Sequence, residues 1–154
     1  MTQRRRSRIL ALLLTFPLLL PTPSVAQHET EWIVVTMARD GSWGVGTSEY
    51  YGPALASALR KCEAMSKERS DCGAEVTAVR KGWTLGILCG DHRVLVAATE
   101  LATAITDAQA RQIYLRGLYG ETLPSCSYVM WVDPQGFAAA SRKPGDAART
   151  ALGK

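Results

Sequence analysis

The chain has 154 residues, with 18 lysines and arginines against 14 aspartates and glutamates, and a formal net charge of +4. Four of the basic residues and none of the acidic ones lie in residues 1–26, which leaves 14 of each in the rest of the chain. A chain without net positive charge does not favour binding to nucleic acid or to an anionic membrane. The length suits one small domain.

Residues 1–26 have the pattern of a secretory signal peptide. A basic start is followed by an apolar run from Ile9 to Leu20 and by the small residues Ser24-Val25-Ala26. The run has about 12 residues, whereas a membrane-spanning helix needs roughly 20. We therefore expect cleavage before Gln27 and a periplasmic or secreted protein that has no membrane contact once the leader is removed. Residues 27–141 would form a single disulfide-stabilised domain, and residues 142–154 a flexible basic tail.

The first half of the domain predicts a hairpin followed by a helix. Residues 32–38 are apolar and β-branched, and an Asp-Gly turn at 40–41 leads into a second strand over 43–47. Gly44 and Gly46 alternate on one face of that strand, leaving space that the next helix is expected to fill. The helix is predicted over 53–66, with an apolar face made by Leu55, Ala58, Leu59, Cys62 and Met65.

The second half predicts two more hairpins around a helix. Strands over 74–80 and 83–89 are expected to pair through a turn at Lys81-Gly82, and a strand over 93–99 follows. A capping box, Thr106-x-x-Gln109, marks the expected start of the second helix. Its inward residues would be Ala110, Ile113, Tyr114 and Leu118. A last hairpin over 127–141 completes an α+β fold of antiparallel hairpins, with two helices packed on one face.

The two halves also resemble each other at an offset of 54 residues. This offset places Ala54 on Ala108, Cys72 on Cys126 and Gly82 on Gly136. An internal duplication and a chance alignment of two helix–hairpin units both explain the pattern.

The four cysteines, Cys62, Cys72, Cys89 and Cys126, are expected to form two disulfides. Their spacings include no C-x-x-C pair, which argues against zinc and, in an exported chain, favours disulfides. Three pairings are open. We favour Cys62–Cys72, which would tie the helix to the strand after it, and Cys89–Cys126, which would join the two halves. Losing either bond should cost about 2–4 kcal/mol.

The order Trp43-Gly44, Ala54-x-x-x-Ala58-Leu59-x-x-Cys62, Cys72 and a strand ending at Cys89 resembles a known family. Its members are small exported bacterial domains, rich in alanine and cysteine and known chiefly as a domain of unknown function. The resemblance covers roughly residues 32–132, and it implies a fold and a compartment but no reaction. Family members often carry more cysteines in the second half, where this chain has Cys126 alone.

Few residues are candidates for catalysis. The chain contains two histidines, His28 near the expected mature end and His92 in what reads as an exposed turn beside Asp91 and Arg93. Asp40, Asp91 and Asp133 lie in turns and could gather at one end of the sheet, where carboxylates suit calcium or acid–base work. Aspartate is also simply a preferred turn residue.

We therefore expect an exported binding module of the bacterial envelope, such as an inhibitor or accessory protein, with no catalytic residues, metal or cofactor. Its partner would be another envelope or extracellular protein. Tyr50 and Tyr51, at a hairpin-to-helix corner, are the best candidates for an exposed contact patch, since most strand aromatics should be core. The alternative is a small periplasmic hydrolase that uses the turn carboxylates.

Overall fold

The computed structural model describes residues 31–67 and 71–140. The expected signal peptide, the basic tail and His28 lie outside the described residues. The elements along the chain are β1 (Trp32–Met37), β2 (Trp43–Ser48), α1 (Tyr51–Met65), β3 (Val76–Arg80), β4 (Trp83–Cys89), β5 (His92–Ala98), α2 (Leu101–Tyr119), the 3₁₀ turn η2 (Gly120–Thr122), β6 (Cys126–Val132) and β7 (Ala138–Ala140).

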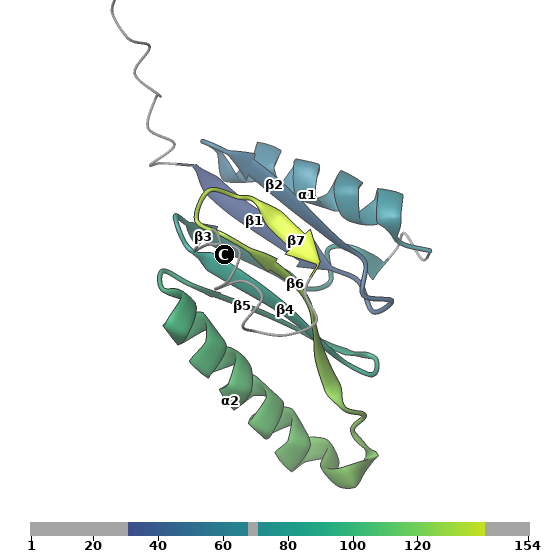
Figure 1. Ribbon diagram of the computed structural model, residues 1–154. Helices are drawn as coiled ribbons and strands as arrows, with labels where there is room; N and C mark the ends of the chain where they lie inside the picture. The colour runs from purple at the N-terminus through teal and green to yellow at the C-terminus, as the bar shows by residue number, and fades with distance from the viewer. Residues whose placement is uncertain (1–30, 68–70, 141–154) are drawn as a thin grey trace, which may run out of the picture.

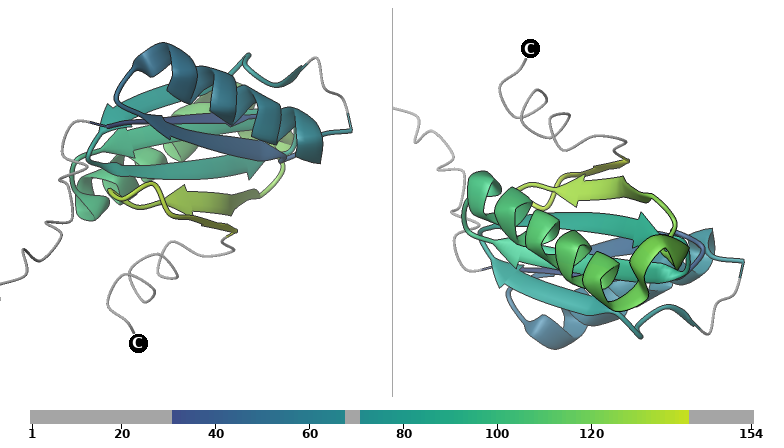
Figure 2. Two further views of the ribbon diagram at one scale, coloured as in Figure 1. Left: turned by 90° about the horizontal axis from the view of Figure 1, so that it is seen from above. Right: turned by 90° about the horizontal axis from the view of Figure 1, so that it is seen from below.

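The strands form two antiparallel sheets that lie face to face between two outer helices (Figure 1). The first sheet has the order β2-β1-β3 and is covered by α1; the second has the order β5-β4-β6-β7 and is covered by α2. The views from above and below show one helix on each outer face (Figure 2). The predicted α+β class is confirmed, but the two helices do not share a face. Each strand set forms its own sheet, so each helix covers a different one.

The fold has four layers, namely α1, the first sheet, the second sheet and α2, and apolar side chains fill the three interfaces between them. Alternate residues of β1 face opposite sides: Val34 packs against Ala54 and Ala58 of α1, whereas Ile33 and Val35 pack against the second sheet. Because both faces of β1 are buried, its sequence is a nearly continuous apolar run. The third layer lies between the second sheet and α2 and contains Leu85, Ile87, Val94, Val96, Ala104, Ala108 and Trp131.

The helix α1 lies unusually close to β2, because glycine and small residues meet there. Gly44 and Gly46 are buried under the helix residues Ala54, Ala58 and Cys62, which repeat every four positions. A Cβ built on Gly46 would lie 1.9 Å from the carbonyl oxygen of Ala54, and one on Gly44 would lie 2.0 Å from that of Ala58. The prediction that the helix fills the space over these glycines is confirmed.

The link between β3 and β4 crosses from one sheet to the other. The two strands were expected to form a hairpin, but β3 pairs with β1 and β4 pairs with β5 and β6. Lys81 adopts a positive φ of 53° at this crossing. Both sheets consequently have one plan, in which a hairpin is followed by a helix and by a third strand beside the first. This shared plan matches β1 with β4, α1 with α2 and β3 with β6, which agrees with the 54-residue offset. An internal duplication stays a prediction.

Both disulfides have the favoured pairing. Cys62 on α1 bonds to Cys72, just before β3, and Cys89 on β4 bonds to Cys126, its cross-strand neighbour on β6. The second bond was expected to join the two halves, but both of its cysteines belong to the second sheet. Two disulfides indicate an oxidising, non-cytoplasmic environment. In the described residues no helix combines the length and the hydrophobicity needed to span a bilayer.

Thr84 on β4 provides a test of the packing between the sheets. Its side chain is fully buried, and its hydroxyl has no hydrogen-bond partner. An unsatisfied buried hydroxyl is destabilising, and valine has nearly the same shape. Thr84→Val should therefore raise the free energy of unfolding by about 1 kcal/mol, measured by urea denaturation. Thr84→Ala is the control and should lower it, because the lost methyl group leaves a cavity. Destabilisation by both variants would contradict the prediction.

Candidate functional site: the groove between α2 and β5

The helix α2 presents an apolar stripe to solvent. Ile113, Tyr114 and Leu118 were predicted to point inward, but their residues are 73%, 60% and 58% exposed. The helix begins at Leu101 with Glu100 as N-cap, five residues before the expected Thr106. Its buried face is made instead by Ala104 and Ala108, flanked by the half-buried Leu101, Ile105 and Leu115.

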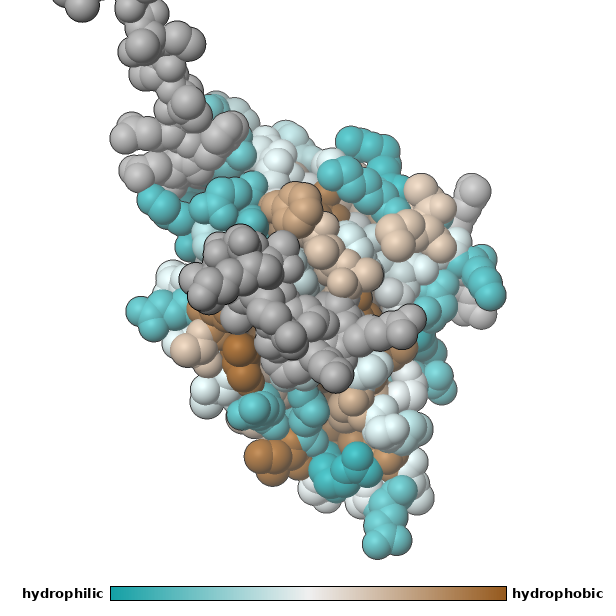
Figure 3. Space-filling model, viewed as in Figure 1, coloured by the Kyte–Doolittle hydropathy of each residue, from teal (hydrophilic) through white to brown (hydrophobic). Residues whose placement is uncertain are grey.

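The error arose because α2 has two apolar stripes. One follows Leu101, Ala104, Ile105, Ala108 and Leu115; the other follows Ala110, Ile113, Tyr114 and Leu118. Larger side chains favoured the second as the core stripe, but the small alanines of the first allow the helix to approach the sheet closely. Hydrophobic surface is visible in the lower part of Figure 3, where α2 lies.

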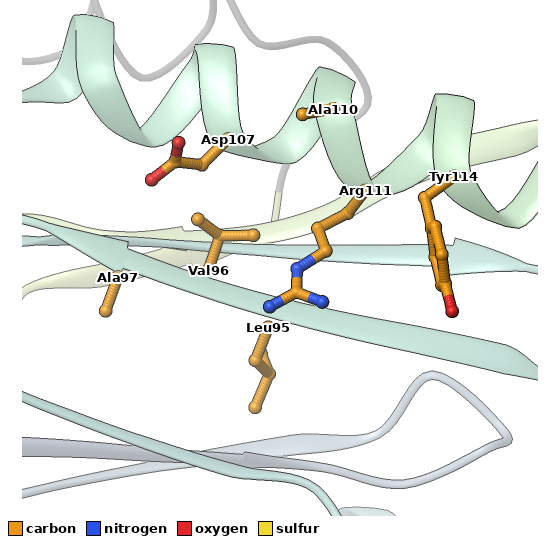
Figure 4. A pocket seen from close by; sticks show the side chains of 7 residues that line it. All are labelled: Leu95, Val96, Ala97, Asp107, Ala110, Arg111 and Tyr114. Atoms are coloured by element: carbon orange, nitrogen blue, oxygen red, sulfur yellow. The ribbon is translucent and has the colours of Figure 1, made fainter.

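A groove runs beside this stripe, between α2 and the edge strand β5. It consists of two hollows, of about 510 Å³ and about 230 Å³, that share Leu95, Arg111 and Tyr114 and so continue into one another. Arg111 and Tyr114 point down from α2 toward β5, while Asp107 lies over Val96 (Figure 4). We call this feature the α2–β5 groove. A strand edge, an apolar wall and a few charged groups form its lining.

Three charged side chains in the lining of the groove have no partner among the described residues: Asp107 and Arg111 on α2, and Glu75 just before β3. Asp107 and Arg111 are one helical turn apart, yet no hydrogen bond or ion pair to another described residue involves either of them. At the far end of the groove, Arg93 is neutralised by the carboxylate of Asp71. The free charges are therefore available to a bound molecule.

The edge of β5 that borders the groove is also unpaired. In the second sheet, β5 hydrogen-bonds to β4 on one side, and no described strand hydrogen-bonds to its other side, although β3 of the first sheet lies close to β5. None of the backbone hydrogen bonds outside the regular elements of the described chain uses β5. The edge strand β2 differs, because the ammonium group of Lys61 donates a hydrogen bond of 2.7 Å to the carbonyl oxygen of Val45. An open edge can accept another strand.

Arg93, which was expected to lie beside His92 at an exposed turn, is largely buried. Its side chain is 12% exposed, and it pairs with Asp71, whose side chain is 17% exposed. Asp71 precedes β3 and Arg93 belongs to β5, so the pair connects the two sheets. The main cause of the lowered pKa of Asp71 is a hydrogen bond from the Arg39 amide, and the Arg93 guanidinium lowers it further. No sequence pattern indicates this pair, because its partners are 22 residues apart.

His92 does not lie in a free turn either. It is the first residue of β5, pairs across the strands with Cys89, and is only partly exposed. Its ring stacks on that of Tyr119, with the centroids 4.2 Å apart. The contact joins the start of β5 to the end of α2, which is a structural role.

The three turn aspartates do not gather at one end of the fold. Asp40 and Asp91 follow the ends of β1 and β4, where Gly41 lies next to Leu88. Asp133 lies at the other end, near the start of β4, since β6 runs antiparallel to β4. Its carboxylate accepts hydrogen bonds from the amides of its own turn at Gln135 and Phe137. In the described residues no group of three or more histidines, cysteines or acids could hold a metal ion.

Asp40 holds the start of the helix-to-strand loop in place. Its carboxylate accepts hydrogen bonds from the amides of Ser42 and Lys67 and from the hydroxyl of Ser66. Partial burial raises the pKa of this carboxyl, but the hydrogen bonds outweigh it and the resulting pKa is about 2. This is the environment of a turn and loop anchor.

The Asp40 pKa gives a prediction for acid stability. The folded pKa of about 2 lies below the ordinary value of 3.8. A lowered folded pKa means that the stabilisation is complete above the ordinary pKa and is lost as the pH falls through the folded pKa. Wild type should therefore lose stability more steeply than Asp40→Asn between about pH 4 and pH 2, as measured by urea denaturation at each pH. Parallel curves for the two proteins in this range would contradict the prediction.

The tyrosine corner is exposed, as predicted. Tyr50 is 71% exposed, and Tyr51 is 43% exposed with its ring edge-on to that of Trp32 at 5.8 Å. The guanidinium of Arg80 lies over the Trp32 ring, 4.5 Å from its centre, in a cation–π contact. Of the strand aromatics, Trp131 is buried, Trp32, Trp43, Trp83 and Tyr128 are half-buried, and Phe137 is exposed. A role of Tyr50 and Tyr51 in partner binding stays a prediction.

A third hollow lies on the opposite side of the fold. It has a volume of about 440 Å³ between α1, β2 and β7 and is lined by Trp43, Met65 and Phe137 among others. The only charged group in its lining is Lys61, which is already bonded to the Val45 carbonyl. This hollow therefore offers apolar contact without a free polar group.

Comparison of the chain with protein-family models, with curated proteins and with solved structures gives no match.

Proposed function

We propose that the protein is an exported, non-catalytic binding module of the bacterial envelope, either periplasmic or secreted. The leader pattern of residues 1–26 and the two disulfides support export. As an inhibitor or accessory protein, it would bind another envelope or extracellular protein through the α2–β5 groove and the stripe beside it.

The observation that carries this proposal is the exposed stripe of Ile113, Tyr114 and Leu118. Scattered apolar residues are common on protein surfaces, but a row at helical spacing next to a groove is typical of an interaction face. Gly117 lies within this row and has open space around its Cα. A glycine inside a helix is destabilising, yet it allows another chain to approach the helix closely.

Site-specific photo-crosslinking in living cells tests the proposal. A photoreactive amino acid at Ile113 should give a discrete higher-mass adduct with another protein, whereas one at Arg60, exposed on α1, should give none. The same residue at Tyr50 tests the tyrosine corner separately.

The variant pair Ile113→Lys and Leu118→Lys provides the control. Both side chains are exposed, so the double variant should keep the melting temperature of wild type. In this double variant the photoreactive amino acid is placed at Tyr114, and the adduct that it gives in the otherwise wild-type protein should be lost. An unchanged adduct, or adducts of equal yield at Arg60, would contradict the proposal.

A further inference from the structure

We infer that the α2–β5 groove binds an extended peptide segment, which adds as a strand to the open edge of β5 and carries opposite charges two residues apart. This inference rests on the proposed function and names the chemistry of the partner. Three observations carry it: the open edge, the course of α2 along that edge, and the free charges of Asp107 and Arg111.

The open edge supplies the backbone contacts. β5 lies at the border of its sheet, and the groove follows it from Ala97 at one end to Arg93 at the other. A strand added here would gain main-chain hydrogen bonds, and its alternate side chains would point toward α2 or toward Leu95. The edge of β2 is less suitable, because Lys61 already occupies one of its carbonyl groups.

The helix runs alongside that edge. α2 follows β5 after only two residues and returns along it, so Asp107 lies at the end of β5 near Ala97 and Tyr114 lies near Arg93. A strand added to β5 would pass under the side chains of Asp107 and Arg111. Figure 4 shows Arg111 directed from α2 toward β5 and Leu95.

The spacing of the two charges matches an extended chain. Four residues of a helix span about 6 Å, and two residues of a strand span about 7 Å on the same face. Two side chains at positions i and i+2 of the added strand can therefore meet Asp107 and Arg111 together. One must be basic and the other acidic. The remaining lining, Val96, Leu95 and Tyr114, suits β-branched or other apolar residues around them.

Three capped heptapeptides test the inference by NMR titration of the disulfide-bonded protein. Their sequences are Thr-Val-Lys-Val-Glu-Val-Thr, Thr-Val-Lys-Val-Lys-Val-Thr and Thr-Val-Glu-Val-Glu-Val-Thr. The mixed-charge peptide should bind about tenfold more tightly than either of the others, because each of those brings one repulsive contact. Its binding should protect the amides of β5 from hydrogen exchange.

The variant Arg111→Glu gives the sharpest control. The groove then carries two acids, so the preference should move from the mixed peptide to the doubly basic one. Arg111 is exposed, so the fold should be unchanged, which the melting temperature checks. Arg60→Glu makes the same charge change on α1 and should leave the preference of wild type intact.

The other outcomes decide against the inference. Equal affinity for the three peptides, an unchanged preference in Arg111→Glu, or binding that leaves β5 unprotected would each overturn it. Protection of β5 that rises with protein concentration in the absence of peptide would also overturn it, because a second copy would then occupy the edge. If the peptides fail while Ile113 still gives a crosslinked adduct, the proposed function stands and the strand-addition mode falls.

Discussion

Replacing Gly46 by alanine should lower the free energy of unfolding by about 3 kcal/mol, a loss at the upper end for added volume in a packed layer. The new methyl group would lie 1.9 Å from the Ala54 carbonyl oxygen and 2.8 Å from the Ala58 amide nitrogen. Both are backbone atoms of α1, so no side chain can rotate out of the way. The helix must move outward, and its contacts with β1 and β2 weaken. Urea denaturation with a two-state fit measures the effect.

Gly117→Ala is the matched control for this substitution. Gly117 is a helical residue with nothing near the position of a Cβ. Alanine should there stabilise the protein by about 1 kcal/mol, because it favours the helix and restricts the unfolded chain. If Gly46→Ala proved neutral, α1 would have to lie farther from β2 than the structure shows.

Removing the Cys89–Cys126 disulfide should be the other severe change. The bond closes a loop with a sequence separation of 37, against 10 for Cys62–Cys72. Loop-closure entropy then gives a stabilisation of about 4 kcal/mol for Cys89–Cys126 and about 3 kcal/mol for Cys62–Cys72. A small domain has only about 5–15 kcal/mol of stability in total. The double variant Cys89→Ala with Cys126→Ala should therefore unfold at a markedly lower urea concentration.

Removing each disulfide separately shows whether the loss of stability depends on which bond is removed or follows equally from the loss of either. Cys62→Ala with Cys72→Ala should lose less stability, and full reduction of wild type should lose at least as much as either variant. A larger loss on removing Cys62–Cys72 would contradict the order, and would indicate that packing of α1 on the glycines depends on that bond.

Most of the elements and the α+β class could be predicted from the sequence, because these depend on local patterns. The disulfides have the favoured pairing, although the sequence left three pairings open. Asp40-Gly41 marks its turn, and Gly44 with Gly46 marks the face that α1 covers. The division into two sheets could not be predicted. Lys81-Gly82 reads as a hairpin turn, and only long-range pairing of β3 with β1 makes it a crossing.

The candidate site was largely missed for a related reason. The periodicity of α2 fits two stripes, and the choice between them depends on the small residues that allow close contact with the second sheet. Ala104 and Ala108 decide it, as Ala54 and Ala58 do in α1. An open strand edge likewise has no sequence signal of its own, because it is a property of which strands lack neighbours. Tyr50 and Tyr51 were found because a Pro-bounded corner is a local feature.

The position of the two disulfides has a mechanical consequence. Neither bond links the two sheets: Cys62–Cys72 ties α1 to the segment before β3, and Cys89–Cys126 lies within the second sheet. The described chain passes between the sheets once, at Lys81-Gly82. The layers are otherwise held by apolar packing and by the Asp71–Arg93 pair. Under tension, the two sheets should separate from each other before either sheet unfolds. Stretching the molecule by its ends should then give two further extensions, one for each sheet with its helix, and each extension should be shortened by the disulfide in that part.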